Sequence, residues 1–254
     1  MASSANGLNI VVPMAGLGSR FSKAGYCVPK PFLDIFGKSM IQCVVENLDV
    51  SRARYILLAR GEHLFTYKSQ IESAMGKRLH SVVPIERLTE GAACTVLHAR
   101  GLIDNDTPLL IANSDQIVDI NIGDYVHDMV ARKLDGSILV FKDEKLDPKW
   151  SFAKLGADGL VSEVQEKKPI SDFATVGIYL FSKGSHFVDA AIDMIARNDR
   201  VNNEFYVCPV YNYLIRAGFK IGVYEIKESQ MHGTGTPEDF ERYKKMIAKA
   251  QHKG

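Results

Sequence analysis

The segment Leu-Asn-Ile-Val-Val-Pro-Met at residues 8–14 is followed at once by Ala-Gly-Leu-Gly-Ser-Arg-Phe at residues 15–21. The first segment is a continuous apolar run of the kind that forms a buried strand. Gly16 and Gly18, placed directly after it, would let backbone N–H groups approach an anion such as a phosphate closely. A tight turn without any ligand would carry the same two glycines. The segment therefore predicts a strand and a turn, and the residues that follow must decide whether the turn binds an anion.

Cations follow the glycine loop at short intervals. Arg20 and Lys23 come first, and Lys30 then stands between Pro29 and Pro31. The two prolines predict an extended backbone around Lys30, which limits where its ammonium group can swing. A glycine loop followed by positioned cations suits a triphosphate, whose charge must be stabilised during transfer.

Two familiar phosphate-binding motifs are absent. A dinucleotide-binding fingerprint requires a glycine three residues after Gly18, and that position is Phe21. The segment Gly37-Lys38-Ser39 could end a P-loop, but the glycine required five residues before Gly37 is replaced by Phe32. Both dinucleotide oxidoreduction and P-loop chemistry lose support.

Composition excludes several classes of protein. The 254 residues are 46% hydrophobic and 24% charged, as in globular proteins, and their net charge of +1 argues against broad nucleic-acid or membrane binding. No apolar run approaches the roughly 20 residues of a membrane span. The four cysteines lie far apart, without the spacing of a zinc site or a disulfide framework. We therefore expect a cytoplasmic protein with no nucleic-acid or membrane partner.

Short apolar runs alternate with helical patterns, which predicts an α/β fold with a largely parallel sheet. Residues 1–7 are predicted to form a loose tail and residues 8–254 a single domain. The expected strands cover residues 8–14, 54–59, 81–84, 108–112, 137–142, 151–155, 160–165, 174–181 and 219–226. The expected helices cover residues 39–48, 64–75, 91–102, 184–197 and 209–217, with a last helix that starts at Thr236.

The ordered motifs of the chain resemble those of the sugar nucleotidyltransferases, also called nucleoside-diphosphate-sugar pyrophosphorylases. The family opens with a strand, a G-x-G-[ST]-R loop and a Lys-Pro pair, and this chain has Gly16-Leu-Gly-Ser-Arg20 and Lys30-Pro31. The matches that follow, in family order, are Gly91-Ala-Ala93, Asn113-Ser-Asp115, Glu166-Lys-Lys-Pro169, Gly177-Ile-Tyr-Leu-Phe181, Asn203-Glu-Phe205 and Gly233-Thr-Gly-Thr-Pro237. The resemblance spans residues 8–240. It implies a three-layer α/β/α fold, Rossmann-like and of the glycosyltransferase-A type, with a mixed, mostly parallel central sheet.

The resemblance also implies roles, by position. Arg20, Lys30 and Asp115 would be catalytic, with Arg20 on the departing phosphates, Lys30 on the α-phosphate and Asp115 holding Mg²⁺. The nucleotide would contact Ala15, Gly16, Gly18, Ser19, Arg20, Gly91, Ala92 and Ser114. The phosphorylated acceptor would contact Glu166, Lys167, Gly177, Asn203 and Glu204.

One departure from the family concerns the metal. Relatives usually carry a second metal-binding aspartate near the G-T-P segment, where this chain has Gly233 beside His232. His232 is therefore a candidate metal ligand, and a surface histidine is the alternative.

The implied reaction joins a nucleoside triphosphate to a sugar 1-phosphate, giving an NDP-sugar for capsule or other surface polysaccharide synthesis and releasing pyrophosphate. The alternatives are a cytidylyltransferase that uses a phosphocholine-like acceptor, a nucleotide-sugar sensor that has lost catalysis, and a glycosyltransferase. A glycosyltransferase usually carries a D-x-D motif, which Asp115-Gln116-Ile117 lacks. The oligomeric state stays open.

Overall fold

The computed structural model describes residues 7–251. The predicted tail at residues 1–7 therefore lies almost wholly outside the described residues. The helices are α1 (Ser19–Lys23), α2 (Met40–Asn47), α3 (Gly61–Thr66), α4 (Lys68–Met75), α5 (Ala92–Leu97), α6 (Arg100–Ile103), α7 (Ile122–Ala131), α8 (Gly184–Ala196), α9 (Val210–Arg216), α10 (Pro237–Gln251) and the 3₁₀ turns η1 (Lys30–Phe32) and η2 (Glu228–Gln230). No helix within residues 7–251 combines the length and apolar character needed to cross a membrane.

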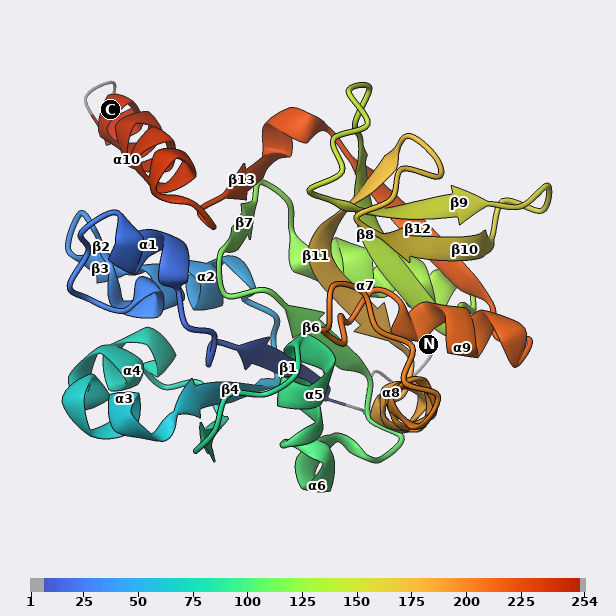
Figure 1. Cartoon of the computed structure of the whole chain (residues 1–254), viewed down its shortest axis with the longest axis horizontal. Coiled ribbons are helices and arrows are strands. Elements are labelled where there is room, and N and C mark those ends of the chain that lie inside the picture. The colour runs from blue at the N-terminus through green and yellow to red at the C-terminus, as the bar shows by residue number, and fades with distance from the viewer. Residues whose placement is uncertain (1–6, 252–254) are drawn as a thin grey trace.

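A nine-stranded mixed sheet forms the centre of the molecule (Figure 1). Its strands are β1 (Leu8–Pro13), β4 (Ala53–Arg60), β5 (His80–Ile85), β6 (Leu109–Ala112), β8 (Gly136–Lys142), β9 (Ser151–Leu155), β10 (Val161–Glu166), β11 (Phe173–Phe181) and β12 (Ile221–Ile226). Their order is β10-β9-β11-β6-β1-β4-β5, and β8 pairs with both β11 and β12. The strands β5, β4, β1 and β6 are parallel, whereas β11 runs antiparallel to β6. Two small sheets pair β2 (Asp34–Ile35) with β3 (Lys38–Ser39) and β7 (Gln116–Val118) with β13 (Met231–Gly233).

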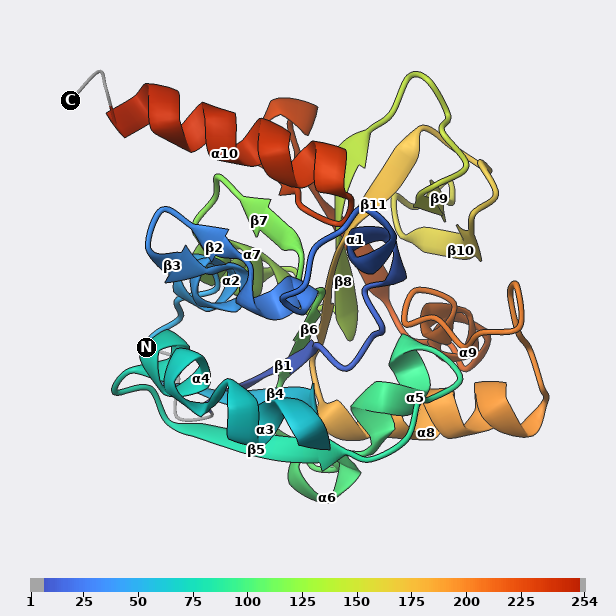
Figure 2. The ribbon, with the colours of Figure 1, turned by 60° about the vertical axis from the view of Figure 1, so that its left-hand side comes forward.

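Helices cover both faces of the sheet because its central strands are apolar on both sides. In β1, Ile10 and Val12 pack into a core with α2, α4 and α7, whereas Val11 between them packs into a second core with α5, α8 and α9. This alternation is the period of two expected for a strand. Figure 2 shows the two groups of helices on either side of the sheet. The predicted three-layer α/β/α class is confirmed.

Two predicted helices are interrupted. The helix expected over residues 64–75 ends at Thr66 and restarts at Lys68, and the Tyr67 between them stacks its ring on Phe32 at 4.2 Å. The helix expected over residues 91–102 ends at Leu97 and restarts at Arg100. The hydrogen bonds tighten to a three-residue spacing at this second break, as the 2.9 Å bond from Ala99 N–H to the Val96 carbonyl shows.

The sheet topology brings distant segments to one edge. Because β1 and β6 are parallel neighbours, the loop after Pro13 and the triplet Asn113-Ser-Asp115 leave the sheet side by side. The antiparallel strand β11 adds Gly177, whose carbonyl accepts a 3.0 Å hydrogen bond from the Asn113 N–H. The edge of the sheet where β1 and β6 end is therefore the place where the sequence motifs converge.

Candidate active site

The glycine loop lines a cavity at this edge. Gly18 has a φ of 60° at the start of α1, a left-handed conformation that glycine adopts without strain. The cavity has a volume of about 490 Å³. Its lining includes these residues predicted to bind nucleotide or to act in catalysis: Ala15, Gly16, Gly18, Ser19, Lys30, Gly91, Ala92, Ser114 and Asp115.

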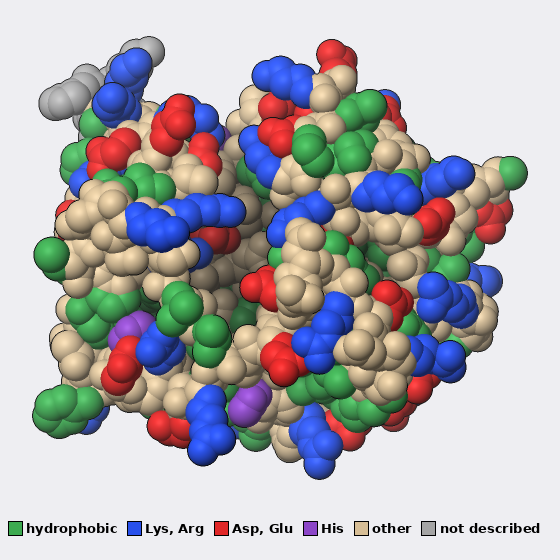
Figure 3. Space-filling view, viewed as in Figure 1, with side chains coloured by type: hydrophobic (Ala, Val, Ile, Leu, Met, Phe, Trp, Pro, Cys, Tyr) green, Lys and Arg blue, Asp and Glu red, His purple; other side chains and the backbone are tan. Residues whose placement is uncertain are grey.

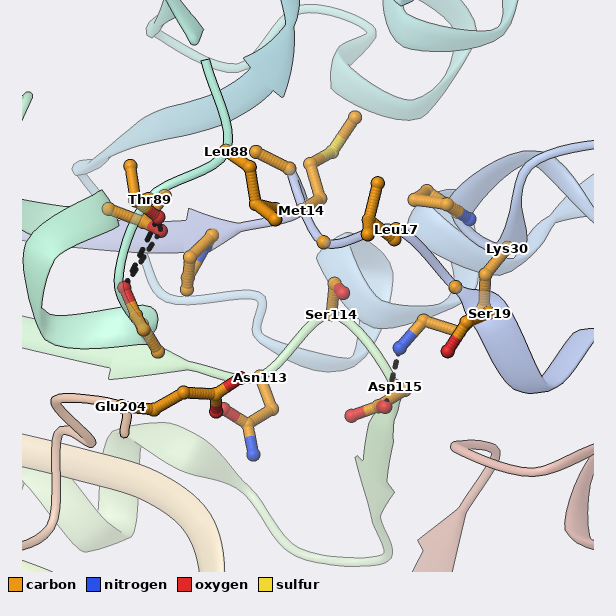
Figure 4. Close-up of a pocket in the computed structure, with 18 of the residues that line it drawn as sticks. Met14, Leu17, Ser19, Lys30, Leu88, Thr89, Asn113, Ser114, Asp115 and Glu204 are labelled. Carbon is orange, nitrogen blue, oxygen red and sulfur yellow. Dashed lines mark hydrogen bonds and ion pairs between the residues drawn. The ribbon is translucent and has the colours of Figure 1, made fainter. Parts of the chain in front are cut away.

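Lys30 and Asp115 meet within this cavity. The Lys30 Nζ atom lies 2.6 Å from the Asp115 Oδ2 atom, and each side chain is only 19% exposed (Figure 4). Lys30 begins η1, while Asp115 follows β6, so the pair joins two segments that are far apart in the chain. A charged pair that is shielded from water keeps more of its Coulomb energy than a surface pair. The cation predicted for the α-phosphate therefore has a defined position beside the predicted metal ligand.

The backbone at Lys30 differs from the extended chain that its prolines predict. Pro29 is extended, but residues Lys30–Phe32 form one 3₁₀ turn, closed by a 2.9 Å hydrogen bond from the Phe32 N–H to the Pro29 carbonyl. Pro31 suits the first positions of such a turn because it has no N–H to leave unpaired. Lys30 is therefore fixed by a turn, with Phe32 buried beneath it.

A second cavity of about 360 Å³ adjoins the first. Four lining residues belong to both cavities: Ala92, Asn113, Asp115 and Tyr206. Among the predicted residues, the second cavity is lined by Arg20, Glu166, Lys167 and Gly177. The two cavities thus form one cleft with Asp115 between them, and Figure 3 shows the molecule hollowed near its centre, with acidic and basic side chains around the hollow.

Four predicted residues lie elsewhere than expected. Arg20, predicted to contact the nucleotide, lines the second cavity and not the first. Glu204, predicted to contact the acceptor, lines the first cavity and not the second. Asn203 is exposed and lines neither cavity. His232 also lines neither, and its Nε2 atom lies 2.7 Å from the Asp119 carboxylate.

Several lining residues were not singled out from the sequence. They include Thr89 and Thr95, whose hydroxyls lie 2.5 Å apart, together with Gln116, Lys149, Trp150, Ser151 and Tyr206. Gln116 follows the Ser114-Asp115 pair, so its position after a buried strand is a signal that could have found it. Tyr206 and Trp150 come from loops with no such signal.

Glu166 lies at the base of the second cavity. Its carboxylate is buried, and it accepts a hydrogen bond from the Ser151 hydroxyl. Burial raises the pKa of Glu166, and the neighbouring Lys167 ammonium opposes this shift. Lys167 has a φ of 55° and places its Nζ atom 2.6 Å from the Tyr206 hydroxyl. A buried carboxylate of this kind can accept hydrogen bonds from a polar ligand seated above it.

Replacing Glu166 with glutamine is expected to stabilise the protein at neutral pH. The pKa of Glu166 is raised in the folded state, so the ionised carboxylate destabilises the folded protein at a pH above that pKa. This loss of stability disappears as the pH falls towards the pKa that Glu166 has in the unfolded chain. We expect Glu166→Gln to raise the Tm by about 2 °C at neutral pH and to flatten its acidic pH dependence. Thermal unfolding of both proteins from about pH 4 to about pH 8 measures this. An unchanged or lower Tm at neutral pH would contradict a raised pKa of Glu166 in the folded protein.

Gly91 lies where two backbone segments approach each other closely. It has a φ of 117°, and a Cβ atom there would clash with the Phe205 carbonyl oxygen and lie 2.6 Å from the Phe205 nitrogen. The Phe205 N–H donates a 2.7 Å hydrogen bond to the Glu90 carbonyl, so neither segment can move freely. Only glycine satisfies both the conformation and the space.

Gly91→Ala is expected to lower the free energy of unfolding by about 3 kcal/mol, because the new methyl group forces apart two hydrogen-bonded segments. Gly101→Ala is the matched control, since Gly101 lies in α6 and a Cβ atom there would have no described atom within 4 Å beyond its chain neighbours and the backbone of its own helix. That control should change stability by less than about 1 kcal/mol. Urea unfolding of both variants measures the difference, and equal stabilities would show that the close approach is unimportant.

Gly177 makes a similar contact with Asn113. Its φ is 90°, and a Cβ atom there would clash with the Asn113 side-chain nitrogen. Glycine at this position allows the Asn113 amide to lie between the two cavities, both of which it lines. The amide can therefore contact a ligand that bridges them.

The donor set at Asp115 fits a magnesium ion that arrives with phosphate. Within residues 7–251 no group of three or more His, Cys, Asp and Glu side chains is arranged to hold a metal. Mg²⁺ commonly binds through one or two carboxylates, with water and substrate phosphate oxygens completing its octahedron. Asp115 on the cleft wall meets that requirement, whereas a fully protein-coordinated ion would lack ligands.

The chain matches a family model described as nucleotidyl transferase over residues 10–245. It is 26% identical over 184 residues to the mannose-1-phosphate guanylyltransferase catalytic subunit beta of Danio rerio, covering 69% of this chain and 50% of that protein. The corresponding Dictyostelium discoideum subunit is 24% identical over 183 residues, with the same coverage. The chain spans about half the length of these curated relatives.

Solved structures resemble the chain over almost its whole length. A nucleoside-diphosphate-sugar pyrophosphorylase from Vibrio cholerae RC9 is 25% identical with a TM-score of 0.79, covering 93% of this chain and 99% of that one. A UDP-glucose pyrophosphorylase complexed with UDP-glucose has a TM-score of 0.79 at 16% identity, covering 96% of this chain and 99% of that one. The latter likeness shows the fold alone.

Proposed function

Because this chain belongs to the nucleotidyl transferase family, we propose that it transfers a nucleotidyl group from a nucleoside triphosphate to a sugar 1-phosphate. The products are an NDP-sugar and pyrophosphate. The observation that carries the proposal is the single cleft, in which the glycine loop and Lys30 line one cavity, Glu166 and Lys167 line the other, and Asp115 lines both.

The proposed reaction is one in-line displacement. An oxygen of the acceptor phosphate attacks the α-phosphorus, a new P–O bond forms, and the bond from the α-phosphorus to the bridging β-oxygen breaks. The bonding electron pair leaves with pyrophosphate. The acceptor phosphate is already an anion, so the enzyme needs no covalent intermediate and contributes by positioning and charge neutralisation.

The residues of the first cavity would hold the triphosphate. The loop at Gly16 and Gly18 offers backbone N–H groups, and the Ser19 hydroxyl adds a donor. The Lys30 ammonium, fixed by η1, stabilises negative charge on the α-phosphate, and Arg20, which lines the adjoining second cavity, would neutralise the departing phosphates. Mg²⁺ held by Asp115 would supply further neutralisation of the phosphate charge when bound.

The residues of the second cavity would orient the acceptor. The buried Glu166 carboxylate accepts hydrogen bonds from hydroxyl groups, and the Lys167 ammonium lies beside it for the acceptor phosphate. The Asn113 amide reaches both ligands from the boundary between the cavities. The two substrates would thus meet at Asp115.

We propose three further properties on the same basis. Residues 8–254 act as a single nucleotidyltransferase domain, the reaction takes place in the cytoplasm, and the product serves capsule or other surface polysaccharide synthesis. Loss of surface polysaccharide after deletion of the gene, restored by the wild-type protein, would support the last of these.

Pyrophosphate release tests the proposed function. Five nucleoside triphosphates are combined with a panel of sugar 1-phosphates and with phosphocholine, in the presence of Mg²⁺. The relatives suggest GTP with mannose 1-phosphate as the first pair. Release confined to one pair supports the proposal and fixes both specificities, whereas silence together with a failure to bind any triphosphate contradicts it.

A further inference from the structure

Gln116 carries a buried polar group that no residue in the described part of the chain satisfies. It follows Asp115 directly, lines the second cavity and is only 8% exposed. Its Oε1 atom is shielded from solvent and has no hydrogen-bond partner among residues 7–251. A buried carbonyl oxygen without a donor is costly, and native proteins rarely leave one unexplained. Because Gln116 lines the second cavity, rotation of its terminal amide would turn this oxygen towards a donor that a ligand supplies there.

Gly233 places no side chain against the Gln116 amide. In the antiparallel pair of β7 and β13, Gly233 lies directly opposite Gln116, and both line the second cavity. A Cβ atom at position 233 would lie 3.6 Å from Oε1 and 3.8 Å from Nε2, in ordinary contact with the amide. Any larger side chain would therefore compete with a ligand for this space. Rotation of the terminal amide can present either its oxygen or its NH₂ group to such a ligand.

We propose that Gln116 determines acceptor specificity by accepting a hydrogen bond from a hydroxyl group of the acceptor. The inference rests on the proposed function, and it adds a second contact to that of Glu166. Asp115 lies at the meeting of the two cavities, and Gln116 is its neighbour in the chain. The hydroxyl that Gln116 accepts from is therefore one close to the acceptor phosphate.

This contact separates two classes of acceptor. A sugar 1-phosphate carries hydroxyl donors beside its phosphate, which can satisfy the Gln116 oxygen. The trimethylammonium group of phosphocholine has no N–H or O–H to donate, so its binding would leave that oxygen unpaired. The structure therefore favours a hydroxylated acceptor.

Monodeoxy analogues of the acceptor test the proposal. The wild-type protein and Gln116→Met are assayed for kcat/KM with the preferred sugar 1-phosphate and with each monodeoxy form. We expect one deoxy analogue to lose about tenfold with the wild-type protein. That loss should largely disappear in Gln116→Met, while the KM for the triphosphate stays unchanged. Phosphocholine should be the poorer acceptor for the wild-type protein.

Ser137→Ala is the matched control, because the Ser137 hydroxyl is also buried with no hydrogen-bond partner among the residues that the structure describes, and Ser137 lines neither cavity. It should leave every deoxy penalty as in the wild-type protein. If Gln116→Met does not fold, Gln116→Asn, which withdraws the amide by one methylene, replaces it with the same expectation.

Deoxy penalties that are equal in the wild-type protein and the Gln116 variant would overturn the inference. A Gln116 variant that changes the Mg²⁺ dependence or the triphosphate KM instead would also overturn it. Absence of turnover with every acceptor in the wild-type protein would contradict the proposed function, and this inference with it. The two failures are therefore distinguishable.

Discussion

Lys30→Ala is expected to reduce turnover by about 10²–10³-fold while the nucleoside triphosphate still binds. The Lys30 ammonium lies in the first cavity, 2.6 Å from the Asp115 carboxylate, and is held by a 3₁₀ turn. A cation fixed in this way stabilises charge that grows on the α-phosphate as it is attacked. The glycine loop and Ser19 remain in the variant and still provide binding. Single-turnover kinetics and a triphosphate titration, run on the same preparation, separate the two effects.

Lys23→Ala is the control for this experiment. Lys23 lies in α1, close in sequence to the glycine loop, but it is exposed and lines neither cavity. Its removal should change turnover by less than about twofold. Unchanged turnover in Lys30→Ala would remove Lys30 from the mechanism.

Asp115→Asn is expected to have an effect of similar size, a loss of about 10³-fold that corresponds to about 4 kcal/mol of transition-state stabilisation. The substitution keeps the shape of the side chain and removes its charge. Asp115 lines both cavities, and its side chain is 19% exposed. The amide would neither hold Lys30 as an ion pair nor offer a carboxylate to Mg²⁺. Turnover measured over a range of Mg²⁺ concentrations records the loss.

The control here is Asp193→Asn, because Asp193 is exposed on α8 and lines neither cavity. It should leave both turnover and Mg²⁺ dependence unchanged. Full activity in Asp115→Asn would contradict the placement of the metal at Asp115. His232 and its neighbour Asp119 would then be the candidate metal ligands to test.

The elements that could be predicted from sequence are those with local signals. The apolar run at residues 8–14 is β1, the Asp158-Gly159 turn joins β9 to β10, and the Thr236 hydroxyl accepts a 3.1 Å hydrogen bond from the Asp239 N–H at the start of α10. Each depends on neighbours in the chain. The break at Tyr67 could not be predicted in the same way, because it accompanies a tertiary contact, the stacking of Tyr67 on Phe32.

The candidate site could likewise be predicted only in part from the sequence. The resemblance to the nucleotidyltransferase family implied site roles for Gly16, Lys30, Asp115 and Glu166, and all four line the one cleft. The close approach of Lys30 to Asp115 bridges segments far apart in sequence, which no local pattern encodes.

The relation of Gln116 to Gly233 is another pairing that only the fold creates. It depends on the register of β7 against β13, which brings residues far apart in the chain directly opposite each other. In the sequence, Gly233 is notable because it stands where relatives usually carry an aspartate. The structure places it beside an amide that needs a hydrogen-bond donor.

Transfer of a labelled α-phosphate tests the central claim most directly. The triphosphate found active in the pyrophosphate assay, labelled at its α-phosphorus, is incubated with its sugar 1-phosphate and Mg²⁺, and the products are separated. We predict that all the label lost from the triphosphate appears in the NDP-sugar, in amounts equal to the pyrophosphate formed. No label should leave the triphosphate without the acceptor. Label that appears only in nucleoside mono- or diphosphate, with the sugar phosphate unconsumed, would contradict the proposed attack on the α-phosphorus.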